Sequence, residues 1–471
     1  MALAVVVGIP LIACSQAATN SPEASSDVVA IEGNAKPIDA RGYLFPPPPI
    51  VPDGELAPAT STAVDRLVAS AETSLDFNAL EAVAASGDAR LAWVLADLLR
   101  FLQVGRAGEE LVGAFEKLTE VDLAADSNSS GSPWRAVTDH LIAWDLPPPP
   151  GYQELKRRLF LLVEPRWSPF FSDEDATIDW RWVSWGGVLI DDRPLGDGGF
   201  CERGCIPALD DPALTDVTGG DWYSDGYVVF GVVVNGEAVA FPKNMMEIHE
   251  LVNITIGGRR VGIPYCTLCG SAQAYFLDSV PSWDEAIVLR TSGLLSRSNK
   301  VMYDLNTESI IDTFTGVALS GPLQDAAVTL EQTTVVGSLW GDWKTEHPDT
   351  MIVARDGGIG RSYPDDPLQG RDAAGPIFPV GDVDPRLAAQ TLVVGVIGSD
   401  GIPVAFPIEE ARSAIAAGEV VTLGDVRLQA DGSGFRAELL SGNEAVAHQA
   451  FWFAWSQFHP GSLLWSASSQ P

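Results

Sequence analysis

The chain has 471 residues, of which 46% are hydrophobic and 20% are charged. Single cores usually stop growing beyond roughly 250 residues, so this length predicts two or three domains, and the hydrophobic share argues against wholesale disorder. The formal net charge of −34 comes from 63 acidic and 29 basic residues. Because such a field repels phosphate backbones, it argues against nucleic acid as a partner, and the sequence identifies no protein partner.

An apolar run at residues 2–13 predicts export. The run is too short to span a bilayer, which takes roughly 20 apolar residues, but it fits the apolar part of a signal peptide, although no Lys or Arg precedes it. The residues from Leu11 to Cys14 resemble a bacterial lipobox, in which the cysteine carries the lipid. We therefore expect a signal peptide at 1–14, a lipid anchor in the bilayer at Cys14, and a place in the cell envelope outside the cytoplasm. The alternative is a buried N-terminal strand with an incidental cysteine.

Composition and periodicity divide the rest of the chain into three parts. Residues 15–58 are rich in Ser, Ala, Asn, Asp and Pro, which predicts a disordered tether. Residues 59–165 carry apolar side chains at helical spacing, and residues 166–471 contain β-branched runs separated by turn residues. The expected fold class is α+β, with an all-helical layer followed by a β-rich domain made of two related halves.

The two halves, at about 227–354 and 391–466, share motifs in the same order. Each contains a predicted hairpin that closes on Ala-Phe-Pro, and the first hairpin has the favoured turn Asn235-Gly236. Each also contains two tryptophans followed by His-Pro, at His347 and at His459. Features found in both halves are better candidates for the shared fold, so we interpret these two histidines as structural.

Features found only in the longer first half are the better candidates for chemistry. A helix-like segment at 245–253 contains His249 and Glu250, and the pair Cys266 and Cys269 follows it. Two thiols at this spacing can form a disulfide, cycle as a dithiol, or provide two ligands to a soft metal such as copper or zinc, with His249 as a third ligand. A zinc-protease helix is rejected, because Asn253 stands where that motif needs a second histidine.

Two further groups extend this candidate site. Cys201 and Cys205 could supply accessory ligands or a disulfide, and in an oxidising compartment one or two structural disulfides are the plain alternative. The segment 290–304 is dense in small polar groups and could line a pocket with the cysteines. Its candidate pocket residues are Ser292, Asn299, Tyr303 and Asp304. An ordinary strand and turn is the alternative for this segment.

The motifs from Gly204-Cys205 through His249-Glu250 and the cysteine pair to Met302-Tyr303-Asp304 resemble, in combination and order, the domain-of-unknown-function family numbered 3179. The resemblance covers about residues 199–465 and implies an exported protein with no established activity. The chain departs from the family pattern at Ile254, Thr267, Ile311 and Thr313.

The leading functional hypothesis is a lipid-anchored protein that binds a soft metal or cycles a dithiol through Cys266, Cys269 and His249. The alternative is a non-catalytic structural or interaction module of the envelope with structural disulfides. Enzymatic turnover of a small molecule stays open, because the sequence names no catalytic residue.

Overall fold

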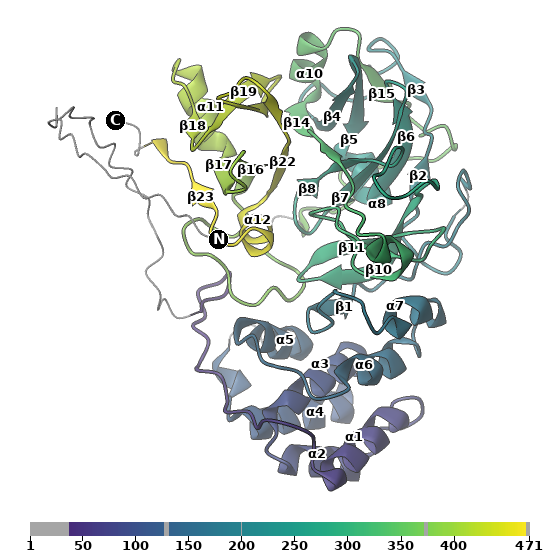
Figure 1. The fold of residues 1–471 in the computed structure, drawn as a ribbon, viewed down its shortest axis with the longest axis vertical. Helices are drawn as coiled ribbons and strands as arrows, with labels where there is room; N and C mark the ends of the chain where they lie inside the picture. Colours follow the sequence, from purple (N-terminus) through teal and green to yellow (C-terminus); the bar gives the residue numbers. More distant parts are fainter. Residues whose placement is uncertain (1–36, 127–130, 199, 372–374, 468–471) are drawn as a thin grey trace, which may run out of the picture. The chain divides into compact units, whose positions relative to one another are not determined.

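The computed structural model of the chain describes residues 37–126, 131–198, 200–371 and 375–467 (Figure 1). The predicted signal peptide with Cys14, and residues 15–36 of the predicted tether, lie outside these residues. Within them the fold is α+β, with helices in the N-terminal region and a β-rich C-terminal part, as the sequence predicts.

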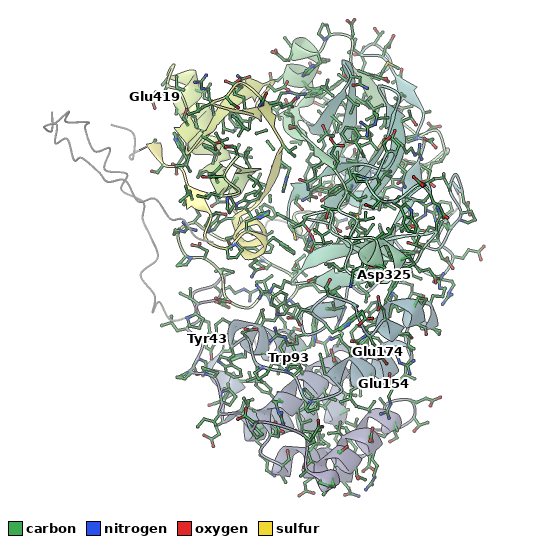
Figure 2. The ribbon with its side chains drawn as sticks, in the orientation of Figure 1. Tyr43, Trp93, Glu154, Glu174, Asp325 and Glu419 are labelled. Carbon is green, nitrogen blue, oxygen red and sulfur yellow. A yellow bond between two sulfur atoms is a disulfide. The ribbon has the colours of Figure 1, made fainter. Side chains whose placement is uncertain are left out.

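Helices make up the described chain from Pro58 to Ser172. Apolar stripes explain them: in α4, for example, Leu111, Phe115 and Leu118 all face the core. Trp93 (Figure 2) is buried among these helices, and its indole N–H donates to Leu146 O at 2.8 Å. The helices are α1 (Pro58–Ser70), α2 (Phe77–Ala85), α3 (Ala92–Phe101), α4 (Gly105–Thr119), α5 (Pro133–Ala143), α6 (Tyr152–Phe160) and α7 (Ser168–Ser172), with short 3-10 helices at Ala89–Leu91, Leu123–Ala125 and Pro165–Trp167.

The described part of the predicted tether lies against these helices. Phe45 is only 3% exposed, and the indole N–H of Trp144 donates to Pro46 O at 2.7 Å. Further along, a guanidinium N–H of Arg90 donates to Gly54 O at 2.8 Å. A buried aromatic side chain and satisfied backbone carbonyls therefore order a segment whose composition alone predicts disorder.

Five sheets follow within the described residues. In order across each sheet, the first sheet has β1 (Val183–Trp185), β10 (Leu289–Ser296), β11 (Asn299–Asp304) and β12 (Ile310–Asp312), and the second has β13 (Gln332–Thr333), β9 (Ala274–Phe276), β7 (Arg259–Cys266), β6 (Leu251–Ile256) and β2 (Leu209–Asp210), with β8 (Ser271–Ala272) beside β7. The third sheet has β14 (Val336–Leu339), β4 (Val228–Val234), β5 (Glu237–Pro242), β15 (Met351–Val353) and β3 (Leu214–Thr215). The fourth has β22 (Ala447–Phe451), β16 (Leu392–Ile397), β17 (Pro403–Pro407) and β23 (Leu463–Leu464), and the fifth has β18 (Thr422–Leu423), β19 (Val426–Asp431), β20 (Gly434–Leu439) and β21 (Glu444–Ala445). Five more helices accompany these sheets within the described residues: α8 (Lys243–His249), α9 (Gly321–Asp325), α10 (Trp340–Glu346), α11 (Ile408–Ala416) and α12 (Trp452–Phe458).

Two of these sheets have the same strand arrangement. In the third sheet β14 and β4 are antiparallel and β15 runs parallel to β5, and in the fourth β22 and β16 are antiparallel and β23 runs parallel to β17. Each has a tryptophan pressed onto a central glycine, because a Cβ atom would lie 2.3 Å from the Trp343 ring at Gly231 and 2.0 Å from the Trp455 ring at Gly395. The two sheets thus share strand order, strand direction and a glycine–tryptophan contact.

The segment 245–253 differs from its prediction. Helix α8 ends at His249, Glu250 has a positive φ of 52°, and Leu251 begins strand β6, so only the first part of the segment is helical. A left-handed residue at this position ends a helix and redirects the chain. Helix α11 follows β17 just as α8 follows β5. The second half therefore does have a helix here, contrary to the sequence interpretation, and what it lacks are the side chains of His249 and Glu250.

The helical region and the first sheet share one hydrophobic core, in which Leu294, Val301 and Tyr303 of β10 and β11 pack with the buried faces of the helices. Strands β10 and β11 thereby gain one anchored face. Among the described residues, no helix combines the length and the apolar character needed to cross a membrane.

Candidate functional site

The two candidate thiols occupy a tight turn at the end of a strand. Cys266 is the last residue of β7, residues 267–270 turn, and β8 returns alongside with Cys266 opposite Ser271. The backbone N–H of Cys269 donates to Cys266 O at 3.2 Å, and Gly270 takes a positive φ of 58°. The turn places both sulfur atoms on the same side of the chain, next to the hairpin of β10 and β11.

Both thiols are buried, with exposed fractions of 2% for Cys266 and 0% for Cys269. They share an acceptor, because their Sγ atoms lie 3.7 Å and 3.5 Å from Ser298 O. The backbone N–H of Lys300 donates to Cys266 Sγ at 3.4 Å. Cys269 packs in a hydrophobic cluster with Val393, Ala450 and other residues of the fourth sheet, so the second half of the β-rich part shields the pair from water.

The surroundings shift the pKa values of the two thiols in opposite directions. Burial by itself raises the pKa of the Cys266 thiol, but hydrogen bonds from the Cys269 thiol and from the Lys300 backbone, together with the Lys300 ammonium, lower the pKa overall. Burial and the neighbouring Cys266 raise the pKa of the Cys269 thiol well above its usual value. Cys266 is therefore the thiol that ionises first, and the Cys269 thiol, whose pKa is higher, keeps its proton.

A buried ion pair lies beside the thiols. Lys300 Nζ is 3.8 Å from Glu250 Oε2 and also contacts Glu250 O, and the two side chains are 4% and 13% exposed. Thr267, inside the cysteine turn, donates its hydroxyl to Glu250 Oε1 at 3.0 Å. Burial lowers the pKa of Lys300 and raises the pKa of Glu250, while the opposite charge of each opposes the shift of the other. Glu250 is thus tied both to the cysteine turn and to the cation next to it.

Glu250 holds this position through an unusual backbone conformation. Its φ of 52° lies in the left-handed region, which non-glycine residues seldom adopt. Its backbone N–H closes α8 by donating to Met246 O at 2.8 Å, and its carbonyl accepts from Tyr265 N at 2.8 Å, one residue before Cys266. The end of α8 and the end of β7 are therefore fastened together at the site.

A cavity of about 150 Å³ opens beside Cys266. Its charged lining residues are Glu250 and Lys300, and glycines at 186 and 293 and Thr267 complete the polar part. Six apolar side chains form the rest of the wall: Val188, Ile206, Leu268, Leu294, Leu295 and Phe378. The more acidic thiol therefore faces a space that a ligand could enter.

His249 lies elsewhere, although it is adjacent to Glu250 in the sequence. Its Nδ1–H donates to Pro207 O at 2.7 Å, and its Nε2 accepts from the Tyr363 hydroxyl at 2.8 Å. It lines a different cavity, of about 80 Å³, with Arg193 and Arg361. Burial lowers the pKa of this imidazole to about 4, so the ring is neutral at pH 7. The structure does not bring His249 to the thiols, because the left-handed Glu250 turns the two side chains into separate cavities.

Cys201 and Cys205, which are four residues apart in the sequence, form a disulfide. Together with Asp191 they form the one cluster, among the described residues, of at least three His, Cys, Asp or Glu side chains whose potential metal-ligand atoms all lie within 4.8 Å of one another. Because both sulfurs are engaged in the disulfide, neither offers a thiolate to a metal. The pair is not an accessory to the Cys266 site, and the plain alternative of a structural disulfide fits it.

The four predicted pocket residues lie in the β10–β11 hairpin but do not line the cavity. Ser292 donates its hydroxyl to Val301 O, Tyr303 donates to Asp191 O at 2.7 Å, and Asp304 accepts from Val288 N at 2.7 Å. Asn299 is 1% exposed. Their neighbours Gly293, Leu294, Leu295 and Lys300 line it instead, because a register shift between Thr291 and Leu295 changes which side chains of β10 face the thiols.

Lys300 and Phe378 are the site residues that sequence reasoning missed. Lys300 stands inside the polar segment 290–304, and its position opposite Leu295 in a hairpin follows from the Arg297-Ser298 turn. Phe378 comes from a distant segment whose neighbours Val380 and Gly381 donate their backbone N–H groups to Asp139 of α5, at 2.7 and 2.8 Å. No local pattern points to such a contact.

Residues 203–433 match the model of a family described as "Protein of unknown function (DUF3179)". The matched range contains the cysteine turn, Glu250, Lys300 and Phe378. The comparisons with curated proteins and with solved structures gave no match. The resemblance seen in the sequence is thereby confirmed: residues 203–433 are similar to this family of unknown function.

Proposed function

We propose that the chain is an exported, lipid-anchored protein whose Cys266 and Cys269 form a redox-active dithiol that exchanges with disulfides. The observations that carry the proposal are geometric: the two buried sulfurs lie within 3.7 Å of the same carbonyl oxygen of Ser298, the backbone N–H of Lys300 donates to Cys266 Sγ at 3.4 Å, and a cavity opens beside Cys266. A structural thiol pair needs neither an acidified sulfur nor a route to it.

The chemistry uses only the two thiols and a substrate disulfide. The Cys266 thiolate attacks one sulfur of the substrate, so a mixed disulfide forms and the other substrate sulfur leaves as a thiolate. Cys269 then loses its proton and attacks Cys266 Sγ. The second substrate sulfur leaves, the protein holds a Cys266–Cys269 disulfide, and the substrate carries the two electrons as two thiols.

A trapping experiment tests this sequence of steps. In Cys269→Ser the second step is blocked, so a small disulfide reagent should leave a stable mixed disulfide on Cys266 that intact-protein mass spectrometry detects. In Cys266→Ser, under the same conditions, the buried Cys269 should stay unmodified. Equal labelling of both variants, or of neither, would contradict the proposal.

The structure favours a dithiol over the predicted three-ligand copper or zinc site, because both ring nitrogens of His249 are already hydrogen-bonded in another cavity. The competing reading is a non-catalytic envelope module with two structural disulfides. Counting thiols in protein denatured without reductant separates them. A reducible pair at Cys266 and Cys269 supports the dithiol, and two disulfides that resist dithiothreitol in the folded protein support the module.

The anchor at Cys14 is part of the proposal and rests on the lipobox-like residues 11–14. Cys14→Ser should move the protein from the membrane fraction to the soluble fraction of the cells that make it. Continued sedimentation with membranes after this substitution would remove the anchor from the account.

We also propose that the β-rich part arose from two related halves. Support comes from the shared order of β14-β4-β5-β15 and β22-β16-β17-β23, and from the equivalent indole hydrogen bonds, Trp343 to Thr350 at 3.0 Å and Trp455 to Ser462 at 2.9 Å. On this view the second half keeps the scaffold and covers Cys269, while the first half holds the chemistry. Superposition of a solved structure's two halves, with equivalent strands failing to overlay, would refute it.

A further inference from the structure

The cavity beside Cys266 has the size and lining of a binding site for one apolar ring. Cavities of about 150 Å³ lined by Leu, Ile and Phe bind benzene in water, and this one has about that volume and a wall of six apolar side chains. Val188, Ile206, Leu268 and Phe378 are only half buried, so part of this wall faces open space. An apolar group that entered would leave water and pack against these side chains.

The charges around the cavity do not suit an anionic ligand. Lys300 is its one lining cation, and that ammonium is already held by the carboxylate and the carbonyl of Glu250. Arg100 is not part of the lining; its guanidinium stands 5.6 Å from the Phe378 ring centre and donates to Trp185 O. A carboxylate placed in the cavity would therefore lose its water without gaining a free cation.

We infer that the cavity selects the substrate of the dithiol: a disulfide that carries an uncharged apolar ring, or a branched aliphatic group of similar size, on the sulfur that Cys266 attacks. The inference rests on the proposed dithiol function and adds its substrate class. The apolar group would occupy the cavity and present its sulfur to Cys266, and the other half of the disulfide would leave toward solvent as the thiolate. Anionic disulfides, including charged peptides with carboxylates near the sulfur, would be poor substrates.

Two chromogenic disulfides of similar reactivity test the inference on the full folded chain: dithiodipyridine, which is neutral at pH 7, and dithiobis(nitrobenzoate), which carries two carboxylates. The rate constant with each is divided by that of a small free thiol with the same reagent, which removes the intrinsic reactivity. We expect the normalised rate with the neutral reagent to exceed that with the anionic reagent by about tenfold or more. Measurement at low and high salt separates this preference from the long-range effect of the net charge, because only the latter is screened.

Variants of the wall make the test specific. Phe378→Lys adds a cation to the wall and should shrink or reverse the preference, whereas Ile377→Lys adds the same charge at the next residue, which is 43% exposed and outside the lining, and should leave it unchanged. Phe378→Met, an apolar replacement, controls for loss of packing and should keep the preference.

The outcomes separate the two levels of the argument. If neither reagent modifies Cys266 in the folded protein, the proposed dithiol function fails. If both react with equal normalised rates, or if Ile377→Lys changes the ratio as much as Phe378→Lys does, the dithiol stands and the substrate class is wrong.

Discussion

Removing either member of the buried ion pair should change the reactivity of Cys266, and the two removals should act in opposite directions. Lys300→Met takes away a cation that favours the Cys266 thiolate, so it should slow alkylation of this thiol at pH 7. Glu250→Gln takes away an anion that disfavours the thiolate, so it should speed alkylation. Few purely structural defects would produce this opposition.

The structure sets the size of the effect. Both side chains are buried, at 4% and 13% exposure, so solvent screens them little. Lys300 and Glu250 both act on the pKa of Cys266. In a buried setting a neighbouring full charge commonly changes the thiolate fraction of a cysteine by about tenfold or more, and the alkylation rate follows that fraction. The backbone N–H of Lys300 stays in place in Lys300→Met, so the hydrogen bond to Cys266 Sγ is kept and only the ammonium, with its contacts to Glu250, is removed.

The assay is the rate of iodoacetamide labelling of Cys266 between pH 5 and pH 10, read by mass spectrometry. Matched controls come from the neighbouring pair on α8, because Lys243 and Glu247 form an ion pair that does not line the cavity. Lys243→Met and Glu247→Gln should leave the pH profile of Cys266 unchanged. If Lys300→Met and Glu250→Gln move the profile in the same direction, or by no more than their controls do, the electrostatic account of the site is refuted.

Three further predictions concern the thiol pair, the separate histidine and the scaffold. Cys269→Ala should slow alkylation of Cys266 at pH 7, because Cys266 loses the neighbouring thiol donor that lowers its pKa. Cys269→Ser keeps a hydroxyl donor and should slow alkylation less. Equal alkylation rates in the two variants would contradict the role of the donor. Burial lowers the pKa of the His249 imidazole to about 4 in the folded protein, so below pH 6.5 the unfolded chain binds more protons and the free energy of unfolding falls as the pH falls. At pH 5 this loss is about 2 kcal/mol. Chemical denaturation at pH 7 and pH 5 should therefore show a decrease in the free energy of unfolding that is smaller by about 2 kcal/mol in His249→Gln. Gly231→Ala should lower the free energy of unfolding by about 1–3 kcal/mol, because the added methyl would lie 2.3 Å from the Trp343 ring. The control Gly113→Ala on α4, where no heavy atom lies within 4 Å of the added methyl, should not destabilise the protein. If Gly231→Ala leaves the free energy of unfolding unchanged, the tryptophan ring does not pack directly on this glycine.

Patterns of short range predicted most of the fold. The turn Asn235-Gly236 joins β4 and β5 with Val234 opposite Glu237, which is the two-residue hairpin that Asn-Gly favours. The helical stripes also predicted the N-terminal region. The end of α8 was missed, since nothing in the residue type of Glu250 announces a left-handed backbone, and the segment 37–57 was read as disordered because its order comes from contacts with distant helices.

The candidate site was predicted in part for the same reason. The Cys-x-x-Cys spacing brings Cys266 and Cys269 together by itself, and Glu250 lies beside them as expected. His249 was expected there too, but one left-handed residue sends neighbouring side chains into different cavities. Lys300 and Phe378 reach the site through a hairpin register and a loop held by Asp139, which are tertiary features that sequence spacing does not encode.

A redox titration tests the central claim most directly. The folded protein is equilibrated in buffers with graded ratios of reduced and oxidised dithiothreitol, quenched in acid, alkylated and mapped by mass spectrometry. The account predicts that Cys266 and Cys269 pass together from two thiols to one intramolecular disulfide and back in a reversible two-electron step, while the protein stays folded. Thiols that remain reduced at every ratio, or that join only after denaturation, would contradict it.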